Sequence, residues 1–194
     1  MEKEAVYLNV YDLKIPEDPT AVGRWNSYLY WGGLGLYHSG VQVHGKEYAF
    51  GGSACSETGV FSVRPRNAPA AVFRESLLVG YTEMPAAQVD SLLLDLAAAY
   101  PGNSYNLLQR NCNHFADELS VLLTGNHAPY WINRMAWLGS QLKCVLPEGF
   151  DDPFGASNSS SELLRATPVF CIPSIDDAIE ESEATQNSSS DDEN

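Results

Sequence analysis

The order of its hydrophobic patterns is the feature that most constrains how this chain can fold. In short stretches of the first 85 residues, apolar and polar side chains alternate, which is typical of β-strands with one buried face. Beyond residue 85, apolar side chains recur at intervals of three and four, as on one face of an α-helix. Strands first and helices later predict an α+β domain, a small β-sheet packed against a few helices.

Five strands and three helices are expected. The turn His44-Gly45 between two strand patterns indicates a hairpin. A helix is predicted from Pro85 to Tyr100, a second over 112–124 with Gly125 at its end, and a third within 131–142. The expected strands cover residues 5–11, 36–43, 47–50, 60–63 and 76–81.

Charge is distributed unevenly and predicts where the folded domain ends. Residues 1–150 carry 10 basic and 14 acidic side chains, a net charge of −4. Residues 151–194 carry one basic and 11 acidic side chains, a net charge of −10, and many serines. Such a segment cannot bury enough apolar surface to offset its ordering entropy. We therefore expect one folded domain over 1–150 and a Ser-rich, acidic, mostly disordered tail over 151–194.

The composition also excludes several classes of protein. A net charge of −14 argues against a nucleic-acid binder, which needs a basic surface. No apolar run is long enough to span a bilayer, and the charged first residues do not resemble a signal peptide. Four cysteines without a disulfide-like spacing suit a reducing compartment. We expect a cytoplasmic protein, with the nucleus as the second candidate.

Cys112 lies where a reactive cysteine could form. It follows Asn111, a good N-cap residue, and so falls in the first turn of the second predicted helix. Unpaired N–H groups and the helix dipole there stabilise a thiolate. The alternative interpretation is a small buried cysteine at a helix start, since free cysteine is commonly buried.

His38 is the candidate base for such a thiol. It lies near the start of a predicted strand, and the small residues Ser39 and Gly40 leave room for another segment to approach. A thiol nucleophile needs a base within hydrogen-bond distance, which sequence spacing alone does not establish. The alternative is a structural histidine.

The other candidates indicate no metal or cofactor. His114 follows Cys112 by two positions, so on a helix it points away from the thiol and is expected to cap or pack. No His and Cys pair has the spacing of a zinc site, and the glycines of 32–35 lack the rest of a nucleotide-binding motif. Four aromatic residues before His38 form either a satellite core or a wall of a substrate groove: Trp25, Tyr28, Tyr30 and Trp31.

Four sequence blocks resemble the PPPDE family, and most closely its second-type member. This is a family of permuted papain-fold peptidases also called desumoylating isopeptidases. The resemblance extends from Val6 to Phe150, and the order of histidine before cysteine fits a circular permutation of the papain fold. The blocks are Tyr37-His38-Ser39-Gly40-Val41, Glu47-Tyr48-Ala49-Phe50-Gly51-Gly52, Arg110-Asn111-Cys112-Asn113-His114-Phe115 and Trp131-Ile132-Asn133-Arg134.

The resemblance implies a cysteine isopeptidase that removes ubiquitin or SUMO from lysines of proteins. Carried over to this chain, Cys112 is the nucleophile and His38 the general base. The backbone N–H of Cys112 would stabilise the negative oxygen of the intermediate, with Gln109 or Asn111 as a second donor. Tyr48 is the candidate third residue that orients His38. Because relatives can form homodimers, a homodimer is a further expectation.

Three alternatives remain open from the sequence. A protein S-acyl (palmitoyl) thioesterase would use the same thiol and base. A non-catalytic module that binds ubiquitin-like proteins would keep the fold without turnover. Related lipid acyltransferases use an Asn-Cys-Glu-His-Phe string, but here Asn113 replaces the glutamate. The slightly acidic domain favours ubiquitin, which presents a basic face, over the more acidic SUMO.

Overall fold

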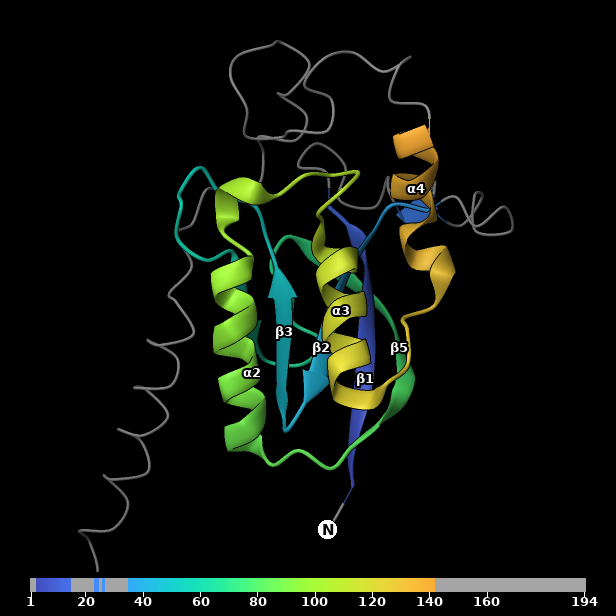
Figure 1. Cartoon of the computed structure of the whole chain (residues 1–194). Coiled ribbons are helices and arrows are strands. Elements are labelled where there is room, and N and C mark those ends of the chain that lie inside the picture. The colour runs from blue at the N-terminus through green and yellow to red at the C-terminus, as the bar shows by residue number, and fades with distance from the viewer. Residues whose placement is uncertain (1–2, 15–22, 25, 27–34, 142–194) are drawn as a thin grey trace, which may run out of the picture.

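The structure is a computed structural model of the chain and describes residues 3–14, 23–24, 26 and 35–141. The predicted acidic tail and the four aromatic residues at positions 25, 28, 30 and 31 lie outside the described residues. The expected α+β fold is confirmed within them: one sheet carries its helices mainly on one face (Figure 1).

The sheet has five strands in the order β4-β3-β2-β1-β5, and every neighbouring pair is antiparallel. The predicted hairpin joins β2 to β3, where His44 and Gly45 both have positive φ, 47° and 73°. Because β1 lies between β2 and β5, the N-terminal strand is an interior strand of the sheet, next to the edge strand β5. The strands are β1 (Glu4–Leu13), β2 (Tyr37–Val43), β3 (Lys46–Phe50), β4 (Val60–Val63) and β5 (Ala71–Thr82).

Helices α2 (Ala86–Ala99) and α3 (Cys112–Thr124) follow the last strand, and α3 packs across β2, β3, β5 and β1. Figure 1 shows both helices on the same face of the sheet. They contact one another where the Tyr100 ring meets Phe115 edge to face, with centroids 5.2 Å apart. Short 3₁₀ helices, η2 (Gly102–Ser104) and η3 (Tyr130–Asn133), precede α3 and α4 (Arg134–Gln141), respectively.

The core lies between the sheet and these helices. Alternate residues of β1, Val6, Leu8 and Val10, are fully buried there, as the period of two predicts. Phe115 and Leu119 of α3 are also fully buried against them. The hydrophobic face of α3 therefore fixes how its first turn is placed over the sheet.

Strand β1 is longer than predicted, Glu4–Leu13 rather than 5–11, and three further elements differ from their predictions. Strand β5 begins at Ala71 rather than at residue 76, because it pairs with β1 as far as Leu13 and, as an edge strand, leaves Val72 and Phe73 partly exposed. Pro85 is the extended N-cap of α2 and not its first residue. The third helix is divided into η3 and α4.

We expect Phe115→Ala to lower the free energy of unfolding by about 3–5 kcal/mol, because it empties a fully buried aromatic site. Leu122→Ala is a matched control on the same helix, where the side chain is 41% exposed, and should change stability by less than roughly 1 kcal/mol. Urea unfolding of the full chain, followed by circular dichroism, measures both. Equal losses would mean that α3 is not packed as described.

Candidate active site

The first turn of α3 presents Cys112 at a capped helix N-terminus. Asn111 is the N-cap, and its Oδ1 accepts hydrogen bonds from the backbone N–H groups of Asn113 (2.9 Å) and His114 (3.1 Å). These bonds satisfy two of the donors that a helix start leaves unpaired. The cap does not use the N–H of Cys112, which can therefore donate a hydrogen bond to a group beside the sulfur.

The first part of strand β2 lies where α3 begins. Strand β3 pairs with β2 at residues 41–43, and the first part of β2, residues 37–40, extends beyond this pairing. Asn113 binds there: its Nδ2 donates to the carbonyl of Tyr37 (3.2 Å), and its Oδ1 accepts from the Ser39 hydroxyl (2.7 Å). Both Asn113 and Ser39 are buried. The start of α3 is thus fixed to the strand that carries His38.

This docking brings Cys112 and His38 together, with a hydrogen bond between their side chains. Cys112 is only 4% exposed, and its sulfur lies 4.0 Å from the carbonyl oxygen of Tyr37. His38 as a whole residue is partly exposed. The two residues that the sequence singled out for a thiol and its base are therefore neighbours in the structure.

Each member of the pair favours the charged form of the other. Burial raises the pKa of Cys112, but the charge of His38 and the hydrogen bond to it, aided by the Ser39 N–H, outweigh burial and lower that pKa from 9.0. Burial lowers the pKa of His38, but the thiolate charge and its hydrogen bond outweigh burial and raise that pKa above 6.5. Both shifts favour a thiolate beside an imidazolium.

Tyr105 is a site residue that sequence analysis missed. Its hydroxyl donates to the Cys112 sulfur over 3.8 Å and accepts from the backbone N–H of Cys112. Burial and the nearby thiolate raise the pKa of Tyr105 well above 10.0, so it stays a neutral donor. Its only sequence signal is a tyrosine in a polar loop shortly before the cysteine helix, which is not specific.

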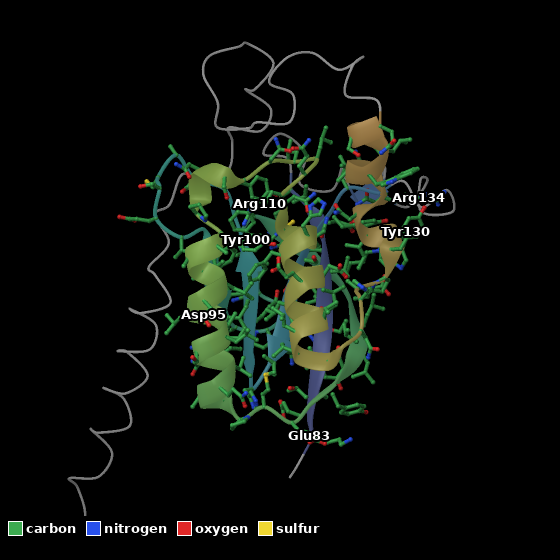
Figure 2. The ribbon with its side chains drawn as sticks, viewed as in Figure 1. Glu83, Asp95, Tyr100, Arg110, Tyr130 and Arg134 are labelled. Atoms are coloured by element: carbon green, nitrogen blue, oxygen red, sulfur yellow. The ribbon has the colours of Figure 1, made fainter. Side chains whose placement is uncertain are left out.

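The loop that carries Tyr105 into α3 is held in place by Asn106 and Arg110. These two residues exchange backbone hydrogen bonds of 3.0 and 2.9 Å. The Arg110 guanidinium lies 4.3 Å from the ring centroid of Tyr100 and donates to the carbonyl of Ala99 at the end of α2. Figure 2 shows Arg110 and Tyr100 together beside the start of α3. The position of the Tyr105 hydroxyl is therefore set by the fold.

The structure distinguishes between the two predicted side-chain donors. Asn111 has both amide hydrogens engaged, with Nδ2 donating to the carbonyl of Leu107 (2.8 Å) and to Oδ1 of Asn133 (2.9 Å). It has no hydrogen left for an oxyanion. Gln109 is exposed beside the loop and stays a prediction.

Tyr48 is not the residue that orients His38, and that prediction is wrong. Its side chain points into the core between the sheet and the helices, and its hydroxyl lies 3.4 Å from Oδ1 of Asp90 on α2. Neighbouring residues of a strand point to opposite faces of the sheet. Glu47, one position earlier, therefore lies on the other face, and its charge acts on His38.

Residues 4–150 match the family described as "PPPDE putative peptidase domain". The chain belongs to the PPPDE peptidase family. Its fold, a five-stranded antiparallel sheet with helices, is consistent with the papain-like fold of PPPDE peptidases.

Several curated proteins are similar to this PPPDE chain. A DeSI-like protein of Arabidopsis thaliana is 46% identical over 143 residues, which cover 74% of this chain and 60% of the relative. The DeSI-like protein sdu1 of Schizosaccharomyces pombe is 40% identical over 173 residues, 84% of this chain and 83% of the relative. A desumoylating isopeptidase 1 homolog of Caenorhabditis elegans is 36% identical over 174 residues. The match spans 85% of this chain but only 49% of that relative.

His114 and Asn133 belong to two of the PPPDE-like blocks and have structural roles at the site. His114 completes a capping box with Asn111, as the prediction that it caps or packs requires. Burial lowers the pKa of His114, so the ring is neutral at pH 7. Its Nε2 lies 3.0 Å from Nδ2 of Asn133 in η3. These contacts tie η3 to the start of α3.

The described part of this PPPDE domain holds no group of three or more His, Cys, Asp or Glu side chains that could bind a metal ion. None of the helices in the same part is long and apolar enough to cross a membrane.

We expect iodoacetamide to alkylate Cys112 with a pH midpoint below 9.0, because His38 stabilises its thiolate. His38→Ala should raise this midpoint, since the cation is lost while burial remains. Mass spectrometry of the Cys112 peptide across a pH series measures the rates, and the Cys55 peptide is the internal control. An unchanged midpoint in His38→Ala would contradict the ion pair.

Proposed function

We propose that this protein is a cysteine isopeptidase that removes SUMO or ubiquitin from lysine side chains, with Cys112 as nucleophile and His38 as general base. The observation that carries the proposal is the hydrogen-bonded thiol and imidazole at the capped start of α3, within a PPPDE domain. A structural cysteine would need neither an imidazole partner nor a lowered pKa.

The reaction follows from this arrangement. The Cys112 thiolate attacks the carbonyl carbon of the modifier's terminal glycine, and a C–S bond forms. The C–N isopeptide bond then breaks as protonated His38 gives its proton to the departing lysine amine. Water, deprotonated by His38, hydrolyses the thioester and releases the modifier with a free carboxylate. Cys112 leaves as the thiolate, and His38 is protonated again.

The negative oxygen of the tetrahedral intermediates would be held by two donors beside Cys112. One is the backbone N–H of Cys112, which donates to the Tyr105 hydroxyl in the free protein. The other is that hydroxyl itself, whose neutral O–H can turn from the sulfur to an oxygen bound at the same place. Both donors lie at a helix start, where the dipole also favours negative charge.

SUMO is the modifier we test first. The Caenorhabditis elegans relative and a human relative, 30% identical over 106 residues, are both named as desumoylating isopeptidases. The net charge of −4 on residues 1–150 argues weakly the other way, toward the basic face of ubiquitin. The relatives' names refer to the modifier that is removed, whereas net charge affects only how the two proteins encounter each other.

We expect SUMO carrying a C-terminal electrophile to form a covalent adduct on Cys112, and purified protein to cleave SUMO conjugates. Cys112→Ala should abolish both reactions. His38→Ala should lower kcat/KM by at least about 100-fold, because general acid–base catalysis contributes on that order. Mass spectrometry maps the adduct, and gel assays follow cleavage.

Ubiquitin with the same electrophile is run in parallel to identify the modifier. A protein thioester is the third substrate, since the same thiolate would attack it. Adduct formation with neither modifier, while the thioester is hydrolysed through Cys112, would overturn the isopeptidase proposal in favour of a thioesterase.

Tyr105→Phe should lower kcat on a SUMO conjugate by roughly 10- to 100-fold, since one donor to the oxyanion is lost. Binding should change little, so KM should stay within about threefold of the native value. Tyr7→Phe on β1 is the control for removal of a tyrosine hydroxyl elsewhere. Native kcat in Tyr105→Phe would exclude its role as a donor.

A further inference from the structure

Glu47 is a fully buried carboxylate on the face of the sheet opposite α2 and α3. Three donors converge on it. The Asn9 amide donates over 2.5 Å, the Tyr11 hydroxyl lies 2.7 and 2.8 Å from its two oxygens, and the Arg66 backbone N–H donates over 2.8 Å. A carboxyl group whose neighbours all donate hydrogen bonds to it is favoured in its ionised form. The fold therefore holds a negative charge at this buried position.

Within the described part of the chain, no cationic side chain forms an ion pair with Glu47. Arg66 approaches it through the backbone, with φ at 66°, while its guanidinium lies over the Phe73 ring. A left-handed arginine is a strained conformation that the surrounding structure must impose. A glutamine of the same size would place its NH2 group against the donors around Glu47, so the arrangement favours a carboxylate.

The carboxylate reaches toward His38 across Gly40. A Cβ atom on Gly40 would lie 2.5 Å from Oε1 of Glu47, so the carboxylate occupies the space that a side chain would take. Gly40 and His38 are two residues apart on the same face of β2, roughly 7 Å along the strand. The Tyr11 ring, whose hydroxyl donates to Glu47, lies beside the His38 ring with centroids 5.9 Å apart.

The charged groups that face His38 come from two elements. The thiolate of Cys112 approaches from α3 and Glu47 from β3, and both raise the pKa of His38 against the effect of burial. Tyr11, from β1, is neutral because burial and Glu47 raise its pKa far above 10.0. The imidazolium thus lies between two anions, one that reacts and one that does not.

We propose that Glu47 is a positioning residue that stabilises protonated His38 across Gly40 and, through it, the thiolate of Cys112. This inference rests on the proposed function in that His38 and Cys112 form the reactive pair. It assigns the third position, expected at Tyr48, to the neighbouring residue. Glu47 touches neither the sulfur nor the substrate and acts only through His38.

The test is Glu47→Gln in the full chain, with the pKa of His38 followed by NMR of histidine-labelled protein. We expect this pKa to fall by about 1.2–1.7, the size expected for a charge roughly 7–10 Å away at an effective dielectric constant of about 20. The pH midpoint of Cys112 alkylation should rise in parallel. A folded Glu47→Gln protein with both midpoints unchanged would overturn the proposal, because a structural role would alter only the melting temperature.

Asp90→Asn is the matched control. Asp90 is a partly buried carboxylate that, like Glu47, lies near a tyrosine hydroxyl, that of Tyr48, but on the opposite side of the sheet. We expect it to leave the His38 pKa and the alkylation midpoint unchanged. An equal shift in this variant would show a general effect of net charge and would overturn the specific role of Glu47.

A measurement on the unaltered chain tests the proposal independently of folding in the variant. The pKa of His38 in the native protein should lie above 6.5, and a value at or below 6.5 would overturn the proposal. These readouts need no modifier. A shifted His38 pKa in Glu47→Gln, combined with no cleavage of SUMO or ubiquitin, would refute the proposed function and leave this inference standing.

Discussion

The hydrogen bonds of Asn113 to the first part of β2 are the interaction on which the rest of the site depends. One amide side chain donates to the Tyr37 carbonyl and accepts from the Ser39 hydroxyl, on either side of His38. Because Asn113 is the residue after Cys112, the same contact sets the position of the sulfur relative to the imidazole. Because Asn113 is buried, any other placement of the helix start would leave its amide without hydrogen bonds, at a cost in free energy. The helix start therefore has one favourable position against the strand.

Around this contact the fold arranges a row of alternating charges. In the charge state that the pKa shifts favour, the thiolate lies at the positive end of α3, the imidazolium near the start of β2, and the Glu47 carboxylate that we propose to act on it lies on β3. Each charge alone would be expensive to bury, whereas neighbours of opposite sign offset part of that cost. The hydrogen-bonded carboxylate cannot react, so it contributes only a fixed field. Preorganised charges of this kind need no rearrangement when the reaction begins.

Hydrophobic periodicity predicted most of the fold because most of its strands and helices have one apolar and one polar face. The range of α3, its Asn111 cap and its Gly125 end were all predictable, since each depends on local backbone chemistry. The edge strand β5 was underestimated because its exposed apolar residues, such as Val72 and Phe73, break the alternation. The homodimer and the compartment stay predictions.

The site was predictable only in part. The residue types and the family blocks pointed to Cys112 and His38, but not to their contact. Tyr105 and Glu47 depend on which loop and which sheet face approach the pair, and these are decided by packing distant in sequence. Glu47 belongs to one of the family blocks, and the lack of a side chain at Gly40 predicts room for an approaching segment. What fills that space is a side chain from the neighbouring strand.

The order of these elements along the chain also bears on biosynthesis. The strand with His38 and the complete sheet end by Thr82, whereas Cys112 opens a helix that is made later. On a ribosome, the nascent sheet would therefore emerge before its nucleophile. Until α3 docks, Cys112 lacks its imidazole partner, although its Asn111 cap is local to the helix. The lowered pKa of Cys112 therefore depends on a long-range contact that can form only after both the sheet and α3 have been made.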